Sequence, residues 1–146
     1  MIVLLQRVKK SSVNIEGKKI AAINEGLLIF VAFVENDTEN QLIRMTERVL
    51  NYRIFSDHEG KMNKSVKDQN FDILVVPQFT LAANTDNGNR PSFSAAADPA
   101  KAQQLFLKFI KCISDQHTNF QQGIFGADMQ INLVNDGPVT FWLEVK

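Results

Sequence analysis

Apolar and polar residues alternate through the first part of the chain in a pattern that predicts β-strands. Three segments have this pattern: residues 2–10, about 13–23 and 27–34. Gly17 and Gly26 interrupt it where turns are expected. Residues 52–56 and 71–79 are predicted as two more strands, and Pro77 marks the end of the second. The first half of the chain is therefore predicted to be rich in β structure.

Two segments have the period of an α-helix instead. The first begins with a capping box at residues 38–41, with Thr38 as the N-cap, and continues to about Asn51. The second begins at Asp98-Pro99, a cap followed by proline at the first helical position. Its apolar face comprises Leu105, Phe106, Phe109, Ile110 and Ile113. Because no repeat or linker divides residues 1–146, we predict a single α+β domain, β-rich and barrel-like, with mainly antiparallel strands and two main helices.

Apolar residues alternate again near the end of the chain, from Phe125 to Leu133 and from Val139 to Val145. We interpret these segments as two half-buried strands on either side of Gly137-Pro138. Proline cannot donate a hydrogen bond to a neighbouring strand and glycine weakens a strand, so this pair either turns the chain or has a function there. The local pattern favours a turn.

Composition and charge limit the partners that the protein can have. Sixteen basic and sixteen acidic side chains give a net charge of zero, which argues against nonspecific coating of nucleic acid through many phosphate contacts. The longest apolar run, residues 27–34, is too short to span a membrane, so no membrane partner is expected. The single cysteine, Cys112, excludes an intramolecular disulfide and fits a reducing cytoplasm, where we expect the protein to be located.

Conventional catalytic groups are few. His58 and His117 lie far apart without the spacing of a metal site, so each is interpreted as a surface or turn histidine. Cys112 lies among apolar helix residues and is interpreted as an inert core thiol. Asp136, directly before the Gly-Pro pair, is interpreted as solvated. The sequence therefore predicts neither a metal site nor a cofactor.

Two places at strand ends stand out, because functional groups gather where rigid strands run into loops. They are residues 77–81 and residues 135–140. Thr80 in the first segment is a candidate nucleophile, but a catalytic threonine needs an activating base and the sequence offers none. We therefore expect Thr80 to orient or hydrogen-bond a neighbouring group rather than to attack a substrate.

At these two places the sequence resembles the D-aminoacyl-tRNA deacylases, a family of chiral-proofreading enzymes also called D-tyrosyl-tRNA deacylases. Six segments in the family's order carry the resemblance across nearly the whole chain: MIVLLQRV at 1–8, RVLNYRIFSD at 48–57, EGKMN at 59–63, QFTL at 78–81, RPSF at 90–93 and NDGPVT at 135–140. The family usually has serine directly before Gln-Phe-Thr. This chain has Pro77 there, so no role is transferred to that position.

The resemblance implies a homodimeric hydrolase that cleaves the ester of D-aminoacyl-tRNA and grips the terminal aminoacyl-adenosine. In the family each subunit places a Gly-Pro pair, here Gly137 and Pro138, in its partner's pocket with a cis peptide bond between the two residues. The backbone oxygens of the pair accept a D-residue and exclude an L-residue, whereas glycine has no side chain to exclude. The ribose 2′-hydroxyl of the RNA helps to activate water.

The resemblance also implies roles for individual residues. The backbone N–H groups of Phe79 and Thr80 are the expected oxyanion donors, so Thr80 is not expected to be the nucleophile. Gln78 and Phe79 are expected to hold the aminoacyl-adenosine, and Arg7 to brace the Gly-Pro pair. Met129 is a candidate for the pocket wall, although its place in the alternating pattern favours the core.

Two alternatives of other kinds stay open at this point. One is a hydrolase of small esters or amides that acts through Thr80. The other is a noncatalytic β-rich dimerisation module in which Gly137-Pro138 is an ordinary turn. The first predicts that activity is lost when Thr80 is changed, and the second predicts no turnover of any aminoacyl-tRNA.

Overall fold

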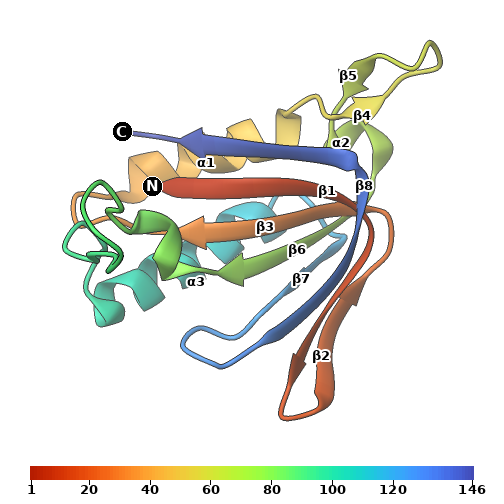
Figure 1. Ribbon diagram of the computed structural model, residues 1–146. Helices are drawn as coiled ribbons and strands as arrows, with labels where there is room; N and C mark the ends of the chain where they lie inside the picture. Colours follow the sequence, from red (N-terminus) through yellow and green to blue (C-terminus); the bar gives the residue numbers. More distant parts are fainter.

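The computed structural model describes residues 1–146 and contains one strongly curved sheet with helices packed against it (Figure 1). The strands of this sheet are β1 (Ile2–Ile15), β2 (Lys18–Ile23), β3 (Gly26–Ala32), β6 (Asp72–Pro77), β7 (Phe120–Gln122) and β8 (Gln130–Glu144). A separate hairpin is formed by β4 (Phe55–Ser56) and β5 (Met62–Lys64). The helices are α1 (Glu39–Asn51), α2 (Val66–Gln69) and α3 (Pro99–Ser114), with a 3-10 helix η1 (Phe79–Ala82). The predicted α+β class with two main helices, α1 and α3, is confirmed.

Strand β1 organises the sheet. It pairs antiparallel with β8 along almost its whole length, while its other edge pairs first with β3 and then with β2. β6 pairs parallel with β3, and β7 pairs parallel with β6. β2 also contacts β6 and β7, which brings the two ends of the sheet towards each other. The sheet is therefore mainly antiparallel and barrel-like, as predicted.

Two apolar clusters hold the fold together. The larger one comprises 25 buried residues and joins the sheet to α1 and α3, so most of the stabilising burial lies in that layer. It includes the predicted apolar face of α3: Leu105, Phe106, Phe109, Ile110 and Ile113. The smaller cluster packs the opposite surface of the sheet around Leu28, Leu74 and Val76. One surface of the sheet thus carries the helices, and the other encloses the interior of the curve.

Both predicted helix starts are present. The N–H of Thr38 donates to the Gln41 side chain at 3.0 Å, which is half of the expected capping box. The Asp98 carboxylate accepts from the N–H of Ala100 at 2.9 Å, directly before Pro99 at the start of α3. Side chains close to each segment in sequence therefore fix where these helices begin.

Several strands differ from the prediction, and the one predicted at 52–56 contains only Phe55 and Ser56. β1 continues to Ile15 because the turn lies at Glu16-Gly17, where both residues have positive φ and make a two-residue hairpin. β8 begins only at Gln130, so Phe125 lies in a loop although its alternation with polar residues imitates a strand. β7 was not predicted, and its three residues are too few for a reliable pattern.

Candidate active site

The buried strand β6 leads the chain to the first candidate segment. Its pairing with β3 ends at Pro77, opposite Val31. The N–H of Gln78 donates to the Val31 carbonyl at 2.8 Å, and the chain then turns into η1. Gln78, Phe79 and Thr80 are thereby brought together directly after a rigid strand.

Two backbone N–H groups are free at this turn. Those of Phe79 and Thr80 donate to no acceptor in the chain, whereas the N–H of Leu81 donates to the Gln78 carbonyl at 3.2 Å. The first N–H groups of a helical turn have no partner within the turn, and no side chain caps them here. Two adjacent free donors are suited to bind an oxygen that gains negative charge during a reaction.

The hydroxyl of Thr80 has a neutral partner. It donates to Oε1 of Gln78 at 2.7 Å, and neither a carboxylate nor an imidazole accepts from it. An amide oxygen cannot take up a proton at neutral pH, so this contact does not activate the hydroxyl for attack. The contact orients the Gln78 amide, which fits the role expected for Thr80.

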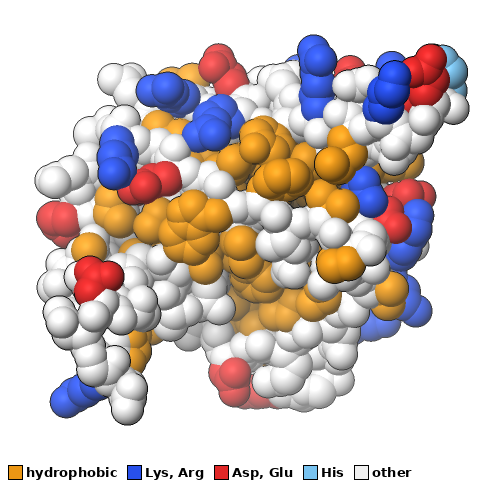
Figure 2. Space-filling model, turned by 45° about the horizontal axis from the view of Figure 1, so that its top comes forward, with side chains coloured by type: hydrophobic (Ala, Val, Ile, Leu, Met, Phe, Trp, Pro, Cys, Tyr) orange, Lys and Arg blue, Asp and Glu red, His pale blue; other side chains and the backbone are white.

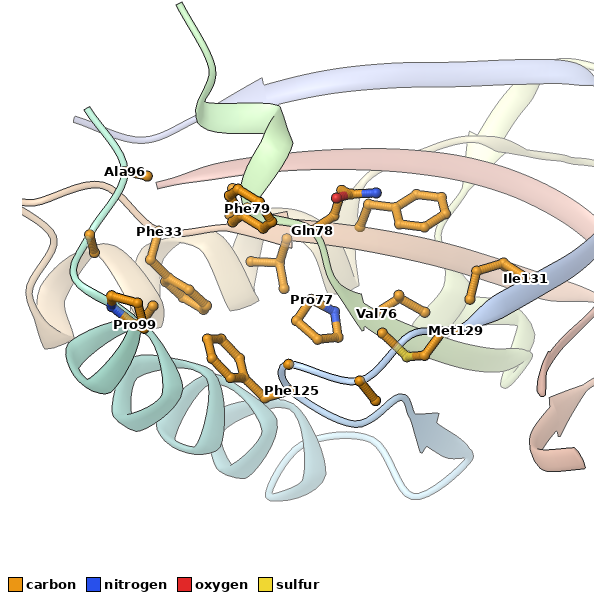
Figure 3. A pocket seen from close by; sticks show the side chains of 17 residues that line it. Phe33, Val76, Pro77, Gln78, Phe79, Ala96, Pro99, Phe125, Met129 and Ile131 are labelled. Atoms are coloured by element: carbon orange, nitrogen blue, oxygen red, sulfur yellow. The ribbon is translucent and has the colours of Figure 1, made fainter. Parts of the chain in front are cut away.

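A pocket of about 470 Å³ opens beside this turn. Thirteen of its 17 lining residues are hydrophobic, so a ligand there is held mainly by apolar contact and by a few polar groups such as the Gln78 amide. In Figure 3, Pro77, Met129 and Phe125 lie around the same space, between the end of β6 and the loop before β8. Met129 belongs to this wall and also packs against the smaller core cluster, so both interpretations of it apply.

Sequence reasoning missed three aromatic or ring-bearing residues of this wall. Phe33 follows β3, Pro99 begins α3, and Phe125 precedes β8 (Figure 3). Phe125 was hidden by its apparent strand pattern, and Pro99 by its role as a helix start. Only the assembled fold brings these segments together. The strands β3 and β6, for example, are neighbours although 46 residues separate Leu28 from its partner Leu74.

Phe79 lies at the mouth of the pocket and is 58% exposed. Its ring centroid is 5.1 Å from that of Phe93, and the two rings are tilted by 58°. This contact joins the segments QFTL and RPSF, two of the six that carry the family resemblance. An exposed pair of aromatic rings beside two free N–H groups is a surface on which a nucleobase can stack.

The second candidate segment forms a large bulge in β8. The flanking pairs of β1 and β8 are Gln6 with Thr140 and Val8 with Asn135. Residues 136–139 therefore stand opposite the single residue Arg7. The two strands predicted on either side of Gly-Pro are in fact one strand that runs through this bulge.

The Gly-Pro pair is exposed within the bulge. The peptide bond between Gly137 and Pro138 is cis, the isomer that the resemblance implies. Gly137 has a φ of 123°, a value that side chains rarely allow. A Cβ atom at Gly137 would lie 2.9 Å from Cγ2 of Val139 and 3.2 Å from Nη2 of Arg7. The position therefore requires glycine for both its conformation and its space.

Arg7 fills the bulge from the side of β1. Its Nε donates to the Asp136 carbonyl at 3.1 Å and lies 3.1 Å from the Asp136 carboxylate. Its Nη1 donates to the carbonyl of Ile54 at 2.6 Å. The interpretation of Asp136 as solvated is wrong, because its side chain is only 25% exposed and pairs with Arg7 and, at 3.5 Å, with Lys9. These charge-assisted contacts support the bracing role expected for Arg7.

The bulge and the pocket lie at opposite ends of β3. Arg7 pairs with Leu27 near the start of that strand, whereas residues 30–33 at its other end line the pocket. Neither Gly137 nor Pro138 belongs to the pocket wall. Within one chain, the two candidate segments are therefore separate.

Comparison with known proteins decides the family. The family model described as D-Tyr-tRNA(Tyr) deacylase matches residues 4–144. The chain belongs to this family. Relatives named D-aminoacyl-tRNA deacylase from Escherichia coli (strain K12 / DH10B) and Shigella boydii serotype 18 are 52% identical over 145 residues, which is 99% of this chain and 100% of theirs.

Two solved structures have the same fold as this chain. One described as c-Myc DNA Unwinding Element Binding Protein is 36% identical with a TM-score of 0.96, covering 100% of this chain and 99% of that one. Another, described as a probable eukaryotic D-amino acid tRNA deacylase, has a TM-score of 0.88 over 99% and 98% of the two chains, and at 16% identity it shows the fold alone. As a member of its family, the protein is an enzyme that hydrolyses the ester bond of D-aminoacyl-tRNA.

The remaining reactive side chains of this deacylase differ in part from the sequence interpretation. His58 is exposed, but His117 is buried and its Nε2 donates to the Phe71 carbonyl at 2.7 Å. Cys112 is half-buried rather than fully in the core, and burial is the main cause that raises the pKa of its thiol.

No three His, Cys, Asp or Glu side chains are grouped so that they could hold a metal ion. None of the helices has the length and apolar character needed to cross a bilayer.

Proposed function

We propose that this deacylase works as a homodimer in which Gly137 and Pro138 of each subunit enter the partner's pocket and exclude L-aminoacyl-tRNA. The observation that carries the proposal is the position of the pair. It is exposed, held by Arg7, and separate from the pocket of its own chain. A second subunit related by a two-fold axis brings each pair to the other subunit's pocket, because such an interface is reciprocal.

Exposed apolar side chains support this dimer. Trp142 on β8 is 52% exposed and pairs with the half-exposed Leu4 on β1, so apolar surface is left on the side of the β1–β8 ladder that faces away from the helices. Figure 2 shows hydrophobic side chains gathered across one face of the molecule, with a hollow among them. A contiguous apolar surface of this kind is typical of a protein–protein interface.

Backbone oxygens of the Gly-Pro pair would then face the α-carbon of the bound aminoacyl group. A D-residue keeps its amino group near these oxygens while its side chain points out of the pocket. An L-residue cannot meet both conditions without a collision. Because the Gly-Pro pair excludes the L-enantiomer and binds no side chain, aminoacyl groups with many different D-side chains are accepted, and glycine is accepted as well.

Catalysis on this proposal relies on the turn after β6 and on the RNA. The Phe79 ring stacks the terminal adenine, a contact type worth about 1–3 kcal/mol, and Gln78 and Met129 complete the binding surface. The neighbouring ribose 2′-hydroxyl activates a water molecule, which attacks the ester carbonyl. The free N–H groups of Phe79 and Thr80 stabilise the oxyanion that forms. The ribose oxygen then leaves, giving free tRNA and the amino acid.

Mixed dimers test the exchange of Gly-Pro pairs between subunits. Gly137→Ala disrupts the pair, and Ala127→Trp fills the pocket from its loop wall, so each variant alone is expected to lose most of its deacylation of D-tyrosyl-tRNA. A mixed dimer, purified through two different tags, has one site with an intact pocket and an intact pair. It is expected to recover about half of the wild-type activity.

A matched control reverses the prediction. When both substitutions are on one chain and the other chain is wild type, neither site of the dimer is complete, and activity is expected to stay lost. If the pair served its own chain, this control dimer would be half active and the first mixed dimer would be inactive. That result, or a monomeric wild-type enzyme with full activity, would refute the exchange.

Thr80→Ala tests the rival in which Thr80 is a nucleophile. The substitution keeps the backbone N–H and removes only the hydroxyl that orients Gln78, so deacylation of D-tyrosyl-tRNA is expected to fall by less than about tenfold. Single-turnover rates of wild type and Thr80→Ala measure the effect. A fall of about four orders of magnitude, or an acyl group trapped on Thr80, would establish the rival mechanism.

A further inference from the structure

The β4–β5 hairpin and the start of α2 form an arm, residues 53–67, that stands apart from the main sheet (Figure 1). β4 and β5 pair only with each other, and all three residues of β5 are exposed. The arm is fixed at its base, where Phe55 is buried and its ring packs on Phe71 with a centroid distance of 5.1 Å. The arm is therefore well anchored, while its outer part covers nothing in its own chain.

Asp57 makes the tip of this arm rigid. Its carboxylate accepts from the N–H groups of Glu59 and Lys61 at 2.9 Å each, and from Nδ2 of Asn63 at 2.8 Å. The Asn63 hydrogen bond is the main cause that holds the pKa of Asp57 below its usual range. The negative charge of Asp57 is thus used to hold the loop in shape.

Positive charge is left over on the arm. Residues 53–67 contain four basic and two acidic side chains, in a chain whose net charge is zero. Lys61 pairs with Glu59, but the exposed Arg53, Lys64 and Lys67 form no ion pair.

Arg53 and Lys64 belong to the same end of the hairpin, since Arg53 lies two residues before Phe55, the cross-strand partner of Lys64. Both charges act on the nearby Asp68, whose carboxylate accepts from the N–H and hydroxyl of Ser65. Those Ser65 hydrogen bonds are the main cause that lowers the pKa of Asp68, and the two cations add to it. Two long cationic side chains beside one already bonded carboxylate leave a local excess of positive charge.

The arm and the Gly-Pro pair are held by the same side chain. Arg7 donates to the carbonyl of Ile54 at the base of the arm and to the carbonyl of Asp136 beside Gly137. In any dimer, the base of the arm therefore lies next to the Gly-Pro pair of the same chain. On the proposed function, that place is the mouth of the partner's pocket.

From this arrangement we propose that the arm of one subunit binds the phosphates of the tRNA whose aminoacyl end occupies the other subunit's pocket. This inference rests on the proposed exchange of Gly-Pro pairs. Arg53 and Lys64, with Lys67 behind them, contact the sugar–phosphate backbone of the single-stranded 3′ end. Their contacts are independent of base sequence, because phosphates carry no sequence information. Each subunit thus supplies both the chiral filter and an RNA grip to its partner's site.

Charge neutralisation tests the RNA grip. The double variant Arg53→Gln, Lys64→Gln is expected to raise the KM for D-tyrosyl-tRNA about tenfold at 0.1 M salt, because each phosphate contact on a single strand contributes about 0.7 to the salt slope. The slope of log(kcat/KM) against log salt concentration should fall by about 1.4. The matched control is Lys18→Gln, Lys19→Gln on β2, which removes two exposed unpaired lysines from a different hairpin. It should leave both quantities unchanged.

A substrate without phosphates separates RNA binding from damage to the fold. On the D-tyrosyl ester of adenosine, the arm variant and the wild type should differ by less than about twofold, because no phosphate is present to be bound. An unchanged salt slope would overturn the proposal. So would an equal loss on the adenosine ester, or an equal effect of the β2 control.

The mixed dimers then show which subunit's arm is used. In the dimer of Gly137→Ala and Ala127→Trp chains, the working site combines the first chain's pocket with the second chain's Gly-Pro pair. Arg53→Gln and Lys64→Gln should raise the KM for D-tyrosyl-tRNA when they are placed on the Ala127→Trp chain. The same substitutions on the Gly137→Ala chain should have no effect. An effect confined to the Gly137→Ala chain would overturn the proposal. Failure of the proposed function gives a different result, since the two parent variants would then not complement each other at all.

Discussion

Purified enzyme is expected to hydrolyse D-tyrosyl-tRNA and glycyl-tRNA while leaving L-tyrosyl-tRNA almost untouched, with a D-to-L ratio above about 200. Hydrophobic pockets that separate substrates by one methylene reach only about 10–200-fold. On the proposed function, the discriminating atoms are backbone atoms of Gly137 and Pro138. The contacts of Arg7 and the ladder to β1 hold that backbone on both sides of the bulge, so it cannot easily move away from a colliding side chain.

Matched preparations of one tRNA charged with D-tyrosine, L-tyrosine or glycine measure this selectivity. The first-order loss of each ester is followed with enzyme in excess, and the spontaneous hydrolysis of each ester is subtracted. Equal rates on the D- and L-esters would refute chiral exclusion by the Gly-Pro pair. Rejection of glycyl-tRNA would show instead that the pocket requires a side chain on the aminoacyl group, contrary to the proposal that the side chain is not bound.

Removal of the 2′-hydroxyl from the terminal adenosine is expected to slow hydrolysis of D-tyrosyl-tRNA by about 10²–10⁴-fold, the usual contribution of a positioned acid–base group. The only hydroxyl of the enzyme at the turn after β6 is that of Thr80, which is bonded to an amide oxygen. No side chain there replaces the lost RNA group. The loss should therefore exceed that caused by Thr80→Ala, or by any single substitution of His58, His117 or Cys112.

Single-turnover rates on substrate esterified at the 3′ position measure this effect. The matched control carries the 2′-deoxy sugar one nucleotide further from the ester, where only RNA binding can change. A rate equal to that of the all-ribose substrate would refute the RNA-assisted mechanism. It would leave the family and the chiral exclusion standing, because neither depends on the source of the activating group.

Much of the fold could be predicted because its signals are local. Each main helix begins with a hydrogen bond between residues two or three positions apart, so a short stretch of sequence is sufficient to place each helix start. The N–H of Thr38 donates to the Gln41 side chain, and the Asp98 carboxylate accepts from the N–H of Ala100. The apolar face of α3 repeats at the helical period and is buried as predicted. The candidate residues Gln78, Phe79 and Thr80 are likewise marked by a local signal, a buried strand that breaks at proline, and their roles stay predictions.

The partners of the Gly-Pro pair depend on pairing between the two ends of the chain. Arg7 and Asp136 meet only because β1 and β8 are neighbours, and nothing in the sequence near Asp136 distinguishes it from a solvated carboxylate. The bulge itself arises from a register shift, which is a property of two strands together. The same reason applies to Phe33 and Phe125, which become neighbours of Pro77 only when β3, β6 and the loop before β8 assemble.

The β1–β8 ladder also sets the order in which the parts can form during synthesis. Most of the pocket wall and the turn after β6 come before residue 130, but the Gly-Pro bulge needs β8 to pair with β1, made more than a hundred residues earlier. Such long-range pairing is slow compared with local folding. A nascent chain therefore cannot present a finished filter. The same ladder carries Leu4 and Trp142, so on the proposed function the Gly-Pro filter and the dimer interface that delivers it to the partner form together.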